Sequence, residues 1–486
     1  MKRFSILLLL AAASVAAISC TRASHLQHPD WAPDVKEAIN DFMDYNVRRG
    51  VKQYAVFDFD NTTSIFDIEE NQMLYQLLTM SFEMSPERLR EVISTDLDLG
   101  SHAYDALIED ISAAYSHLYG QFGPFTYKGL DEAACKDIQA DPMWEEFASK
   151  MNCLYSSIYH RESPTVAYNW TKYWVCGMTE AQVDELSARS NSICSSMETT
   201  AGRWHGSDRI DSQAGPMQYD YVLGVGVTDN ARELWKTLHD NGIDVWVCSA
   251  SGIRQVLAAV DFFGLRDYCT GVLAMTVAKD SLGRFTNAYD YEGHGFLPLT
   301  DGGWKEDSLV TGAQTCGPGK VTAIQNAIAP KYGGRGPAAC FMDSTGDFNF
   351  CTEFSSIQLV TCFNRGTRKV TDGGGLVGET AIYERDALGY DFRKARRAGD
   401  IMFLLQGRDD NGLRSFRPSN ATMRLGEDCE TLFATDENRK ELEYFKSKGL
   451  SVAGILNTFS LKTDTEDSPL GFPFGFLEEY NGYRSR

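Results

Sequence analysis

Short apolar runs alternate with segments of helical periodicity along much of the chain. The runs of strand length are residues 54–57, 243–248, 339–342 and 359–363. The segments with apolar positions at helical spacing include residues 33–49, 229–239, 253–263 and 320–329. Strands that alternate with helices in this way predict an α/β fold with a doubly wound, mostly parallel sheet.

The same pattern divides the chain into regions. Residues 70–220 are mainly helical and rich in aromatic side chains, whereas residues 376–486 combine a strand-like run, an amphipathic segment and a Gly/Pro/Phe-rich end. At 486 residues the chain is too long for one simple core. We therefore expect an N-terminal linker and helix at 21–52, a core of 53–67 plus 222–375, a helical insertion at 68–221 and a C-terminal extension at 376–486.

Two aspartates follow the first predicted strand. Asp58 and Asp60 share the same strand parity, so their carboxylates start on one side, about 6–7 Å apart along an extended chain. Such a pair repels unless a cation neutralises it or one carboxyl stays protonated. Either condition is useful for chemistry. The alternative is a solvated turn, because Asp, Asn and Thr all favour turns.

Polar residues also follow the other predicted strands, where ligands bind in parallel α/β sheets. Ser249 follows the run 243–248, Asp343 and Asp347 follow the run 339–342, and Lys320 opens the helix before that last strand. Ser251 is an alternative to Ser249, although strand alternation favours Ser249. Gln406-Gly407-Arg408-Asp409-Asp410 is a further polar segment after an apolar run, and it is a candidate to line the site.

Each of these residue types has a role in phosphoryl transfer. A carboxylate such as Asp58 can attack phosphorus, and a second one such as Asp60 can protonate the leaving oxygen and then activate water. Ser249 and the N–H groups beside it can hold phosphate oxygens. Lys320 can neutralise charge, and oxygen ligands from Asp58, Asp343 and a backbone carbonyl suit Mg²⁺.

This set of residues resembles the four motifs of the haloacid dehalogenase superfamily of phosphatases, in order, over about residues 53–67 and 222–370. The resemblance implies that Asp58 is the nucleophile, Asp60 the general acid/base, and Thr62, Ser249 and Lys320 the phosphate-binding residues. It implies Mg²⁺ ligands from Asp58, Asp60 (through its main-chain carbonyl) and Asp343, with Asp347 in support. The helical insertion would be a cap over the site. One departure is Met342, where the commonest fourth motif has glycine.

A closer resemblance is to the periplasmic phosphorylcholine phosphatases of bacteria. In that family an acidic pair soon after the first motif helps to hold the trimethylammonium group, and the resemblance places Glu69 and Glu70 in that role. Carboxylates and aromatic faces do suit a quaternary ammonium. The alternative is that Glu69 and Glu70 are a charged first turn of a helix, which is common.

The first 20 residues have the pattern of an export signal. A basic Lys2-Arg3 precedes an apolar segment, residues 6–17, that is too short to span a membrane. Cys20 stands where a bacterial lipobox would place the lipidated cysteine. We therefore expect a lipoprotein that faces the periplasm and meets the membrane only through its lipid. The alternative is cleavage near Ala17, which would leave a soluble periplasmic or secreted protein.

Composition excludes some classes of function. The formal net charge is −21, so nucleic acid is not an expected partner. Twelve cysteines without a CxxC pair, and eight scattered histidines, argue against a structural zinc site. An exported protein is permitted disulfides, and the eleven cysteines besides Cys20 leave at least one thiol that no partner within the chain can bond.

The sequence therefore predicts a Mg²⁺-dependent phosphatase that acts on a small organic phosphomonoester through an aspartyl-phosphate. Phosphocholine is the leading substrate, and phosphoserine or phosphoethanolamine are the alternatives. A phosphotransferase with the same chemistry is a second hypothesis. A lipid-tethered binding protein with a vestigial fold is a third, but such a protein has no need of the acid/base Asp60.

Overall fold

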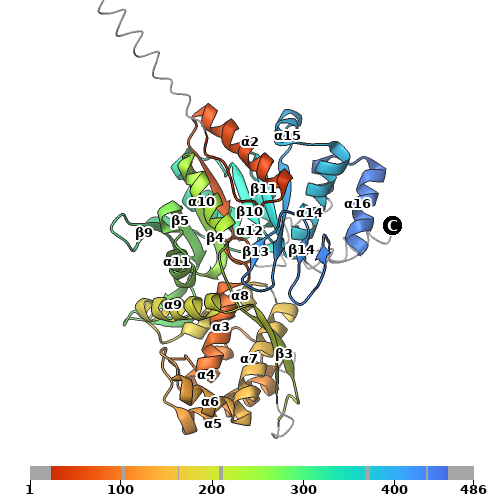
Figure 1. Ribbon diagram of the computed structural model, residues 1–486. Helices are drawn as coiled ribbons and strands as arrows, with labels where there is room; N and C mark the ends of the chain where they lie inside the picture. Colours follow the sequence, from red (N-terminus) through yellow and green to blue (C-terminus); the bar gives the residue numbers. More distant parts are fainter. Residues whose placement is uncertain are drawn as a thin grey trace, which may run out of the picture.

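The computed structural model describes residues 23–100, 104–162, 164–206, 212–366, 373–433 and 436–457. Figure 1 shows two lobes. One contains a large sheet between layers of helices, and the other is a mainly helical insertion beneath the edge where β1 ends. The predicted Cys20 anchor lies outside the described residues. No helix among the described residues is long and apolar enough to cross a membrane.

Within the described residues the main sheet has eleven strands, and its central strands are parallel. Their order is β12-β11-β10-β1-β4-β5, and every neighbouring pair is parallel. These central strands are β1 (Gln53–Phe57), β4 (Ile243–Gly252), β5 (Cys269–Met275), β10 (Ala339–Met342), β11 (Leu359–Asn364) and β12 (Met402–Asp409). Four of them coincide closely with the predicted runs, and the predicted doubly wound α/β fold is confirmed.

Further strands extend the sheet at both edges, antiparallel beyond β5 and of mixed direction beyond β12. On one side β5 pairs with β8 (His294–Pro298), which pairs with β9 (Trp304–Val310). On the other side lie the short strands β13 (Ser415–Phe416), β14 (Thr422–Met423) and β15 (Glu430–Thr431). These edge strands are not predictable from the sequence, because they are short or carry little apolar alternation.

Alternating side chains of the central strands bury themselves against helices on both faces of the sheet. Residues such as Phe57 and Val247 pack with one helical layer, and residues such as Val56 and Cys248 pack with the other. The first layer contains α2 (Pro33–Arg49), α10 (Asp229–Asp240), α11 (Ile253–Phe262) and α15 (Phe392–Ala398). The second contains α12 (Pro318–Ala323), η3 (Ile324–Ile328), α13 (Phe348–Thr352), α14 (Gly373–Tyr383), α16 (Asp436–Lys448) and α17 (Val452–Leu456).

The insertion has a hydrophobic core of its own. Its helices are α3 (Ile68–Thr79), α4 (Pro86–Ile93), α5 (Tyr104–Phe122), α6 (Glu132–Gln139), α7 (Pro142–Arg161), α8 (Pro164–Lys172) and α9 (Glu180–Ser196). Trp170, Tyr173 and Trp174 are almost fully buried in that core, as their helical spacing indicates. A hairpin of β2 (Thr200–His205) and β3 (Gln218–Leu223) completes it and was not predicted.

The segments expected to lie outside the core are part of it. The sequence predicts an extension from residue 376 on, whereas β12 pairs with β11 within the main sheet and α14, which begins at Gly373, packs over it. The described part of the predicted linker, residues 23–30, is docked on α10, because the His28 N–H donates to the Glu233 carboxylate at 3.0 Å. The physical reason is burial: Leu26 is buried in the core beside α10, and β12 and α14 bury apolar side chains against the sheet.

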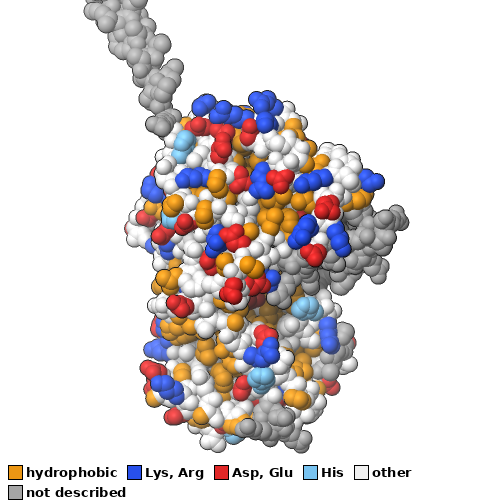
Figure 2. Space-filling view, turned by 45° about the vertical axis from the view of Figure 1, so that its right-hand side comes forward, with side chains coloured by type: hydrophobic (Ala, Val, Ile, Leu, Met, Phe, Trp, Pro, Cys, Tyr) orange, Lys and Arg blue, Asp and Glu red, His pale blue; other side chains and the backbone are white. Residues whose placement is uncertain are grey.

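The surface is mixed in charge despite the net charge of −21. Figure 2 shows acidic and basic side chains interspersed over one face of the molecule, without a continuous basic area. All eleven cysteines among the described residues are free thiols, most of them buried. The described chain is therefore held together by its apolar cores and not by disulfides.

Candidate active site

Four of the predicted residues converge where β1 and β10 end. Asp58 follows β1, Asp343 follows β10, Asp347 ends the short turn η5 (Thr345–Asp347), and Lys320 projects from α12. The Lys320 Nζ lies 2.7 Å from Asp58 Oδ1 and 2.6 Å from Asp347 Oδ1. Asp58, Asp343 and Asp347 each offer a carboxylate oxygen, and these oxygens lie within 4.8 Å of one another.

This cluster holds more negative than positive charge in a buried place. Burial raises the pKa of Asp58, the Lys320 ammonium opposes that rise, and the Asp343 carboxylate adds to it. Burial and the Asp58 carboxylate raise the pKa of Asp347 well above its usual value. Burial alone would lower the pKa of Lys320, but Asp347 and Asp58 raise it well above its usual value. Three buried oxygen ligands beside one ammonium fit a hard divalent cation, which would offset the excess charge.

Asp60 points to the same cleft but has different partners. Its Oδ1 accepts from the Ile68 N–H at 2.7 Å, and its Oδ2 accepts from the Ser251 hydroxyl at 2.6 Å. Burial and the Asp58 carboxylate raise the pKa of Asp60 to about 7. A carboxyl that exchanges its proton near neutral pH can act as both acid and base.

The two candidate serines have different positions. Ser249 is fully buried, and its hydroxyl accepts from the Ser251 N–H at 3.0 Å. Ser251 lines the cleft, whereas Ser249 does not. The strand β4 continues to Gly252, so the later serine reaches the open edge of the sheet. Ser251 is therefore the serine that lines the cleft, and both hydroxyls donate to Asp60 Oδ2, Ser251 at 2.6 Å and Ser249 at 3.4 Å.

Thr62 and Arg365 both contact Asp343. The Thr62 hydroxyl donates to Asp343 Oδ1 at 3.2 Å, and Arg365 Nη1 donates to Asp343 Oδ2 at 2.8 Å. Thr62 is buried, so its hydroxyl orients a carboxylate in this structure and does not line the cleft. Arg365 follows β11 and is half-exposed at the cleft wall. Arg365 lies outside the matched motifs, but it comes two residues after the predicted strand 359–363, which is the kind of position that marked the other candidates.

A cleft of about 650 Å³ opens over these residues, between the two lobes. The core contributes Asp58, Asp60, Ser251, Lys320, Asp343 and Asp347 to its lining. The insertion contributes the tyrosines Tyr155, Tyr159, Tyr168 and Tyr219 and the acidic residues Glu69 and Glu70. The insertion thus forms the wall of the cleft that faces these core residues.

The cleft continues into a side chamber of about 230 Å³ under the hairpin β2–β3. Asp67, Glu70, Tyr155, Tyr219 and Arg365 line both spaces. Asp67 caps α3, because its carboxylate accepts from the Glu69 and Glu70 N–H groups at 2.8 Å. Burial raises the pKa of Asp67 well above its usual value, and the nearby Asp60 and Glu70 raise it further.

The two predicted cation-binding glutamates have different surroundings. Glu70 is exposed to the cleft and the side chamber. Glu69 is buried, and its carboxylate pairs with the Lys172 ammonium and accepts from Thr171 Oγ1 and the Gly252 N–H, both at 3.1 Å. The structure therefore brings Glu70 to the site and gives Glu69 a set of partners within the protein.

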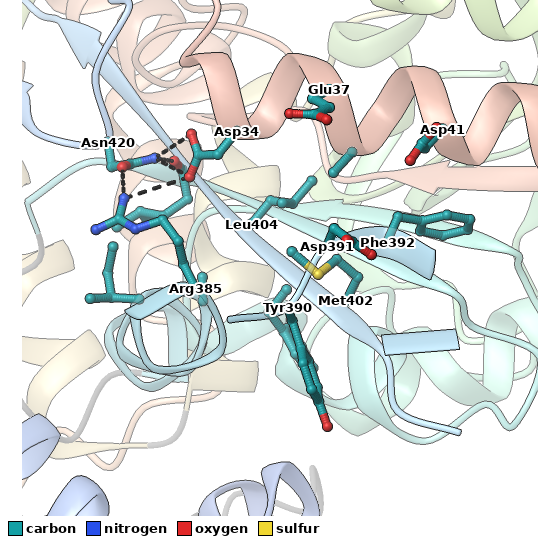
Figure 3. A pocket seen from close by; sticks show the side chains of 15 residues that line it. Asp34, Glu37, Asp41, Arg385, Tyr390, Asp391, Phe392, Met402, Leu404 and Asn420 are labelled. Carbon is teal, nitrogen blue, oxygen red and sulfur yellow. Dashed lines mark hydrogen bonds and ion pairs between the residues drawn. The ribbon is translucent and has the colours of Figure 1, made fainter. Parts of the chain in front are cut away.

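A second, smaller cavity lies away from these residues (Figure 3). It measures about 70 Å³ and lies between α2, the first half of β12 and the turn η6 (Glu384–Leu388). Asn420 donates to both oxygens of Asp34 at 3.2 Å, and Arg385 pairs with the same carboxylate at 3.6 Å. Because its polar groups satisfy one another and no strand ends there, we assign the chemistry to the larger cleft.

No protein-family model matches this sequence, and no curated protein matches it. A solved structure of a protein of unknown function from Anaerococcus prevotii is similar, with a TM-score of 0.62 and 24% identity over 84% of this chain and 99% of that one. This likeness shows the fold. A protein of unknown function from Bordetella pertussis (10% identity, TM-score 0.33) and cytosolic 5'-nucleotidase IIIB bound to cytidine (11% identity, TM-score 0.30) match at scores too low to support a conclusion. They cover 73% and 68% of this chain, and 98% and 78% of their own.

Proposed function

We propose that this protein is a Mg²⁺-dependent phosphatase of the haloacid dehalogenase type, acting on a small organic phosphomonoester. One observation carries the proposal: three buried carboxylates cluster at the strand ends, two of them paired with the buried Lys320, next to an Asp60 whose pKa is raised to about 7. A charge cluster with a purely structural role would not need Asp60, a separate carboxyl with a raised pKa that accepts a hydrogen bond from Ser251 in the cleft.

In the proposed reaction Asp58 is the nucleophile, Asp60 transfers protons, and Lys320 and Ser251 bind the phosphate. In the first step an Asp58 oxygen forms a bond to phosphorus, the ester P–O bond breaks, and the leaving oxygen takes the proton of Asp60. In the second step Asp60 takes a proton from water, the water oxygen bonds to phosphorus, and the bond to Asp58 breaks to release phosphate. Lys320 and the Ser251 hydroxyl hold phosphate oxygens throughout.

The metal site of the proposal consists of Asp58, Asp343 and Asp347. A divalent cation bound there would neutralise the negative charge of the phosphate and of these three carboxylates. The resemblance also assigns the main-chain carbonyl of Asp60 to this set. Mg²⁺ is the ion proposed, because all donors are oxygens and the site is small.

Phosphocholine is the leading substrate of the proposal. Its cationic group fits the wall where Glu70 and Asp67 stand beside Tyr155 and Tyr219, since carboxylates and tyrosine faces attract quaternary ammonium groups. Asp67 replaces Glu69 in this role, because the Glu69 carboxylate is engaged by Lys172. Phosphoserine and phosphoethanolamine are the alternatives, and a phosphotransferase would use the same first step.

The export signal adds a proposed location. A lipidated Cys20 would tether the phosphatase to a membrane on its periplasmic side, and cleavage near Ala17 would instead release it. Mass spectrometry of the mature N-terminus distinguishes the two, because only the first adds acyl chains to Cys20.

The test of the function is phosphate release from a panel of phosphomonoesters by residues 21–486, with Mg²⁺ and with EDTA. We expect release that EDTA abolishes, with phosphocholine preferred over phosphoserine. Glu70→Gln should raise KM for phosphocholine about tenfold and leave KM for p-nitrophenyl phosphate, which has no cation, unchanged. Release from no substrate, or release that is indifferent to EDTA, would overturn the proposal.

A further inference from the structure

The loop that carries Asp58 and Asp60 contains two residues in the left-handed backbone region. Asn61 has φ of 58° and Phe66 has φ of 67°, and neither is glycine. Asparagine tolerates this conformation, but a bulky residue such as Phe66 adopts it only with backbone strain. The surrounding structure therefore has to hold the loop in place.

One side chain from a distant strand contacts both of these residues. Arg408 on β12 donates from Nη1 to the Asn61 carbonyl at 3.1 Å and from Nη2 to Asn61 Oδ1 at 3.2 Å. Its guanidinium carbon also lies 5.7 Å from the centre of the Phe66 ring. Arg408 thus binds the loop at both points where its backbone is unusual.

Arg408 is itself fixed. Its side chain is 2% exposed, and its Nε lies 2.7 Å from Asp410 Oδ1, which is also buried. The Asp410 N–H donates to the Met423 carbonyl at 2.9 Å, so the counterion is anchored on the next strand. A buried ion pair gains little stability over apolar side chains of similar size, so stability alone does not explain it.

The conformation of this loop sets the direction of Asp60. The Asn61 N–H donates to the Phe66 carbonyl at 3.3 Å, which closes the loop, and the Ile68 N–H that follows holds Asp60 Oδ1 at 2.7 Å. If Asn61 and Phe66 left the left-handed backbone conformation, the Ile68 N–H would move and Asp60 would lose the hydrogen bond that orients it toward the cleft. A displacement of about 1 Å at a reacting group can cost roughly a hundredfold in rate.

We propose that Arg408 is a positioning residue, which holds the loop of residues 58–67 in its catalytic conformation through Asn61 and Phe66. This inference rests on the proposed phosphatase function for its kinetic consequence. It assigns a role to the polar end of β12, in the part of the chain that the sequence leaves without one.

The kinetic test compares Arg408→Met with Arg417→Met. Arg417 is a control from the same segment, because it pairs with Asp409 and Glu430 and does not contact the loop. We expect Arg408→Met to lower kcat roughly 10- to 100-fold with a change in KM of less than about threefold, since Lys320 and Ser251 still hold phosphate. Arg417→Met should keep kcat within about twofold. The kcat of Arg408→Lys should lie between that of Arg408→Met and that of Arg417→Met. Unchanged kcat in Arg408→Met would overturn the proposal.

A double-mutant cycle with Asn61→Gly separates positioning from general damage. Glycine adopts positive φ without cost, so the loop then depends less on Arg408. We expect Arg408→Met to lower kcat by less than about threefold in the Asn61→Gly background, against the larger loss in the wild type. Equal losses in both backgrounds would show that Arg408 does not act through the conformation of Asn61.

Hydrogen exchange keeps the test independent of the proposed activity. Backbone amides of residues 59–67 should exchange at least about tenfold faster in Arg408→Met, while amides of β1 and α10 keep their rates. Faster exchange in a protein that releases no phosphate would leave Arg408 as the holder of the loop and refute the phosphatase. Exchange that is unchanged, or raised equally everywhere, would refute the role of Arg408.

Discussion

At the scale of single residues, the hydrogen bonds and the raised pKa of Asp60 lead to the first prediction. It accepts from Ser251 and from the Ile68 N–H, and its pKa is raised to about 7. Asp60→Asn keeps the shape and loses the transferable proton, so turnover of alkyl phosphates should fall about 10²- to 10⁴-fold. Binding of a phosphate analogue such as tungstate, measured by calorimetry, should stay within a few-fold. Wild-type turnover in this variant would remove Asp60 from the mechanism.

Glu384 gives a residue-scale prediction outside the cleft. Its side chain is fully buried, and one oxygen accepts from the Phe403 N–H at 2.7 Å, while the other has no partner among the described residues. Burial raises its pKa well above the usual 4.5. The folded state therefore binds a proton that the unfolded state releases, and stability falls as pH rises from 4.5 through the folded pKa.

Glu384→Gln should remove this dependence, because an amide keeps the acceptor and carries no charge. We expect the free energy of unfolding, measured with urea, to exceed that of the wild type at about pH 8 and to approach it at about pH 5. A variant that is less stable than the wild type at the higher pH would show that Glu384 is ionised in the fold.

Local patterns were sufficient to place several residues that the structure brings to one cleft. Asp58, Asp60, Lys320 and Asp343 could be placed because each follows or precedes a short apolar strand. The preference for Ser249 on strand alternation was not justified, because Ser249 and Ser251 share strand parity and only the length of β4 decides which one reaches the cleft. The tyrosines that the insertion contributes depend on tertiary placement.

At the scale of elements, Glu69 joins two helices of the insertion to each other through Lys172 and contacts the core through Gly252. Glu69 on α3 pairs with Lys172 at the end of α8 and accepts from the Gly252 N–H at the start of α11. Glu69→Gln leaves the Lys172 ammonium buried without its counterion, which should cost about 3–5 kcal/mol of unfolding free energy. The double variant Glu69→Gln with Lys172→Met should recover most of that loss.

The alternative role of Glu69 predicts a different outcome. If Glu69 bound the substrate cation, Glu69→Gln would raise KM for phosphocholine selectively and leave the denaturation midpoint unchanged. Such a result would restore Glu69 to the cation site and contradict the pairing. The sequence could not distinguish the two roles, because Lys172 lies 103 residues away and no local spacing connects it to Glu69.

Elements with strong apolar runs were predictable, and elements defined by pairing were not. The hairpin β2–β3 has mostly exposed or half-buried residues, so no apolar alternation marks it. β12 is apolar enough to be seen as a strand, but its membership of the main sheet follows from its parallel pairing with β11. Long-range pairing of this kind carries no local signal.

At the scale of the whole molecule, the described chain is free of disulfides. Its eleven described cysteines are all thiols, among them the buried Cys248, Cys340 and Cys351. A native disulfide typically contributes about 2–4 kcal/mol, so its reduction would lower the melting temperature by several degrees. We expect the melting temperature to be the same with and without a reducing agent.

A melting temperature that drops on reduction would show a disulfide that the structure lacks. The sequence could not settle this point, because export permits disulfides and an odd count of cysteines is compatible with many pairings. The fold class was predictable at this scale from the alternation of strands and helices. The integration of residues 376–433 and 436–457 into the core was not, because their apolar runs are separated by long polar turns.

The central claim is that Asp58 forms a covalent bond to phosphorus, and trapping that bond tests it most directly. Asp60→Asn should still accept phosphate from p-nitrophenyl phosphate, whose leaving group needs no proton, but should hydrolyse the aspartyl-phosphate slowly. After acid quenching, mass spectrometry should therefore find a phosphoryl group on Asp58 in the peptide 53–67, and none in the double variant Asp58→Asn with Asp60→Asn. Release of p-nitrophenol without phosphorylation of Asp58, or at the same rate in Asp58→Asn, would contradict the account.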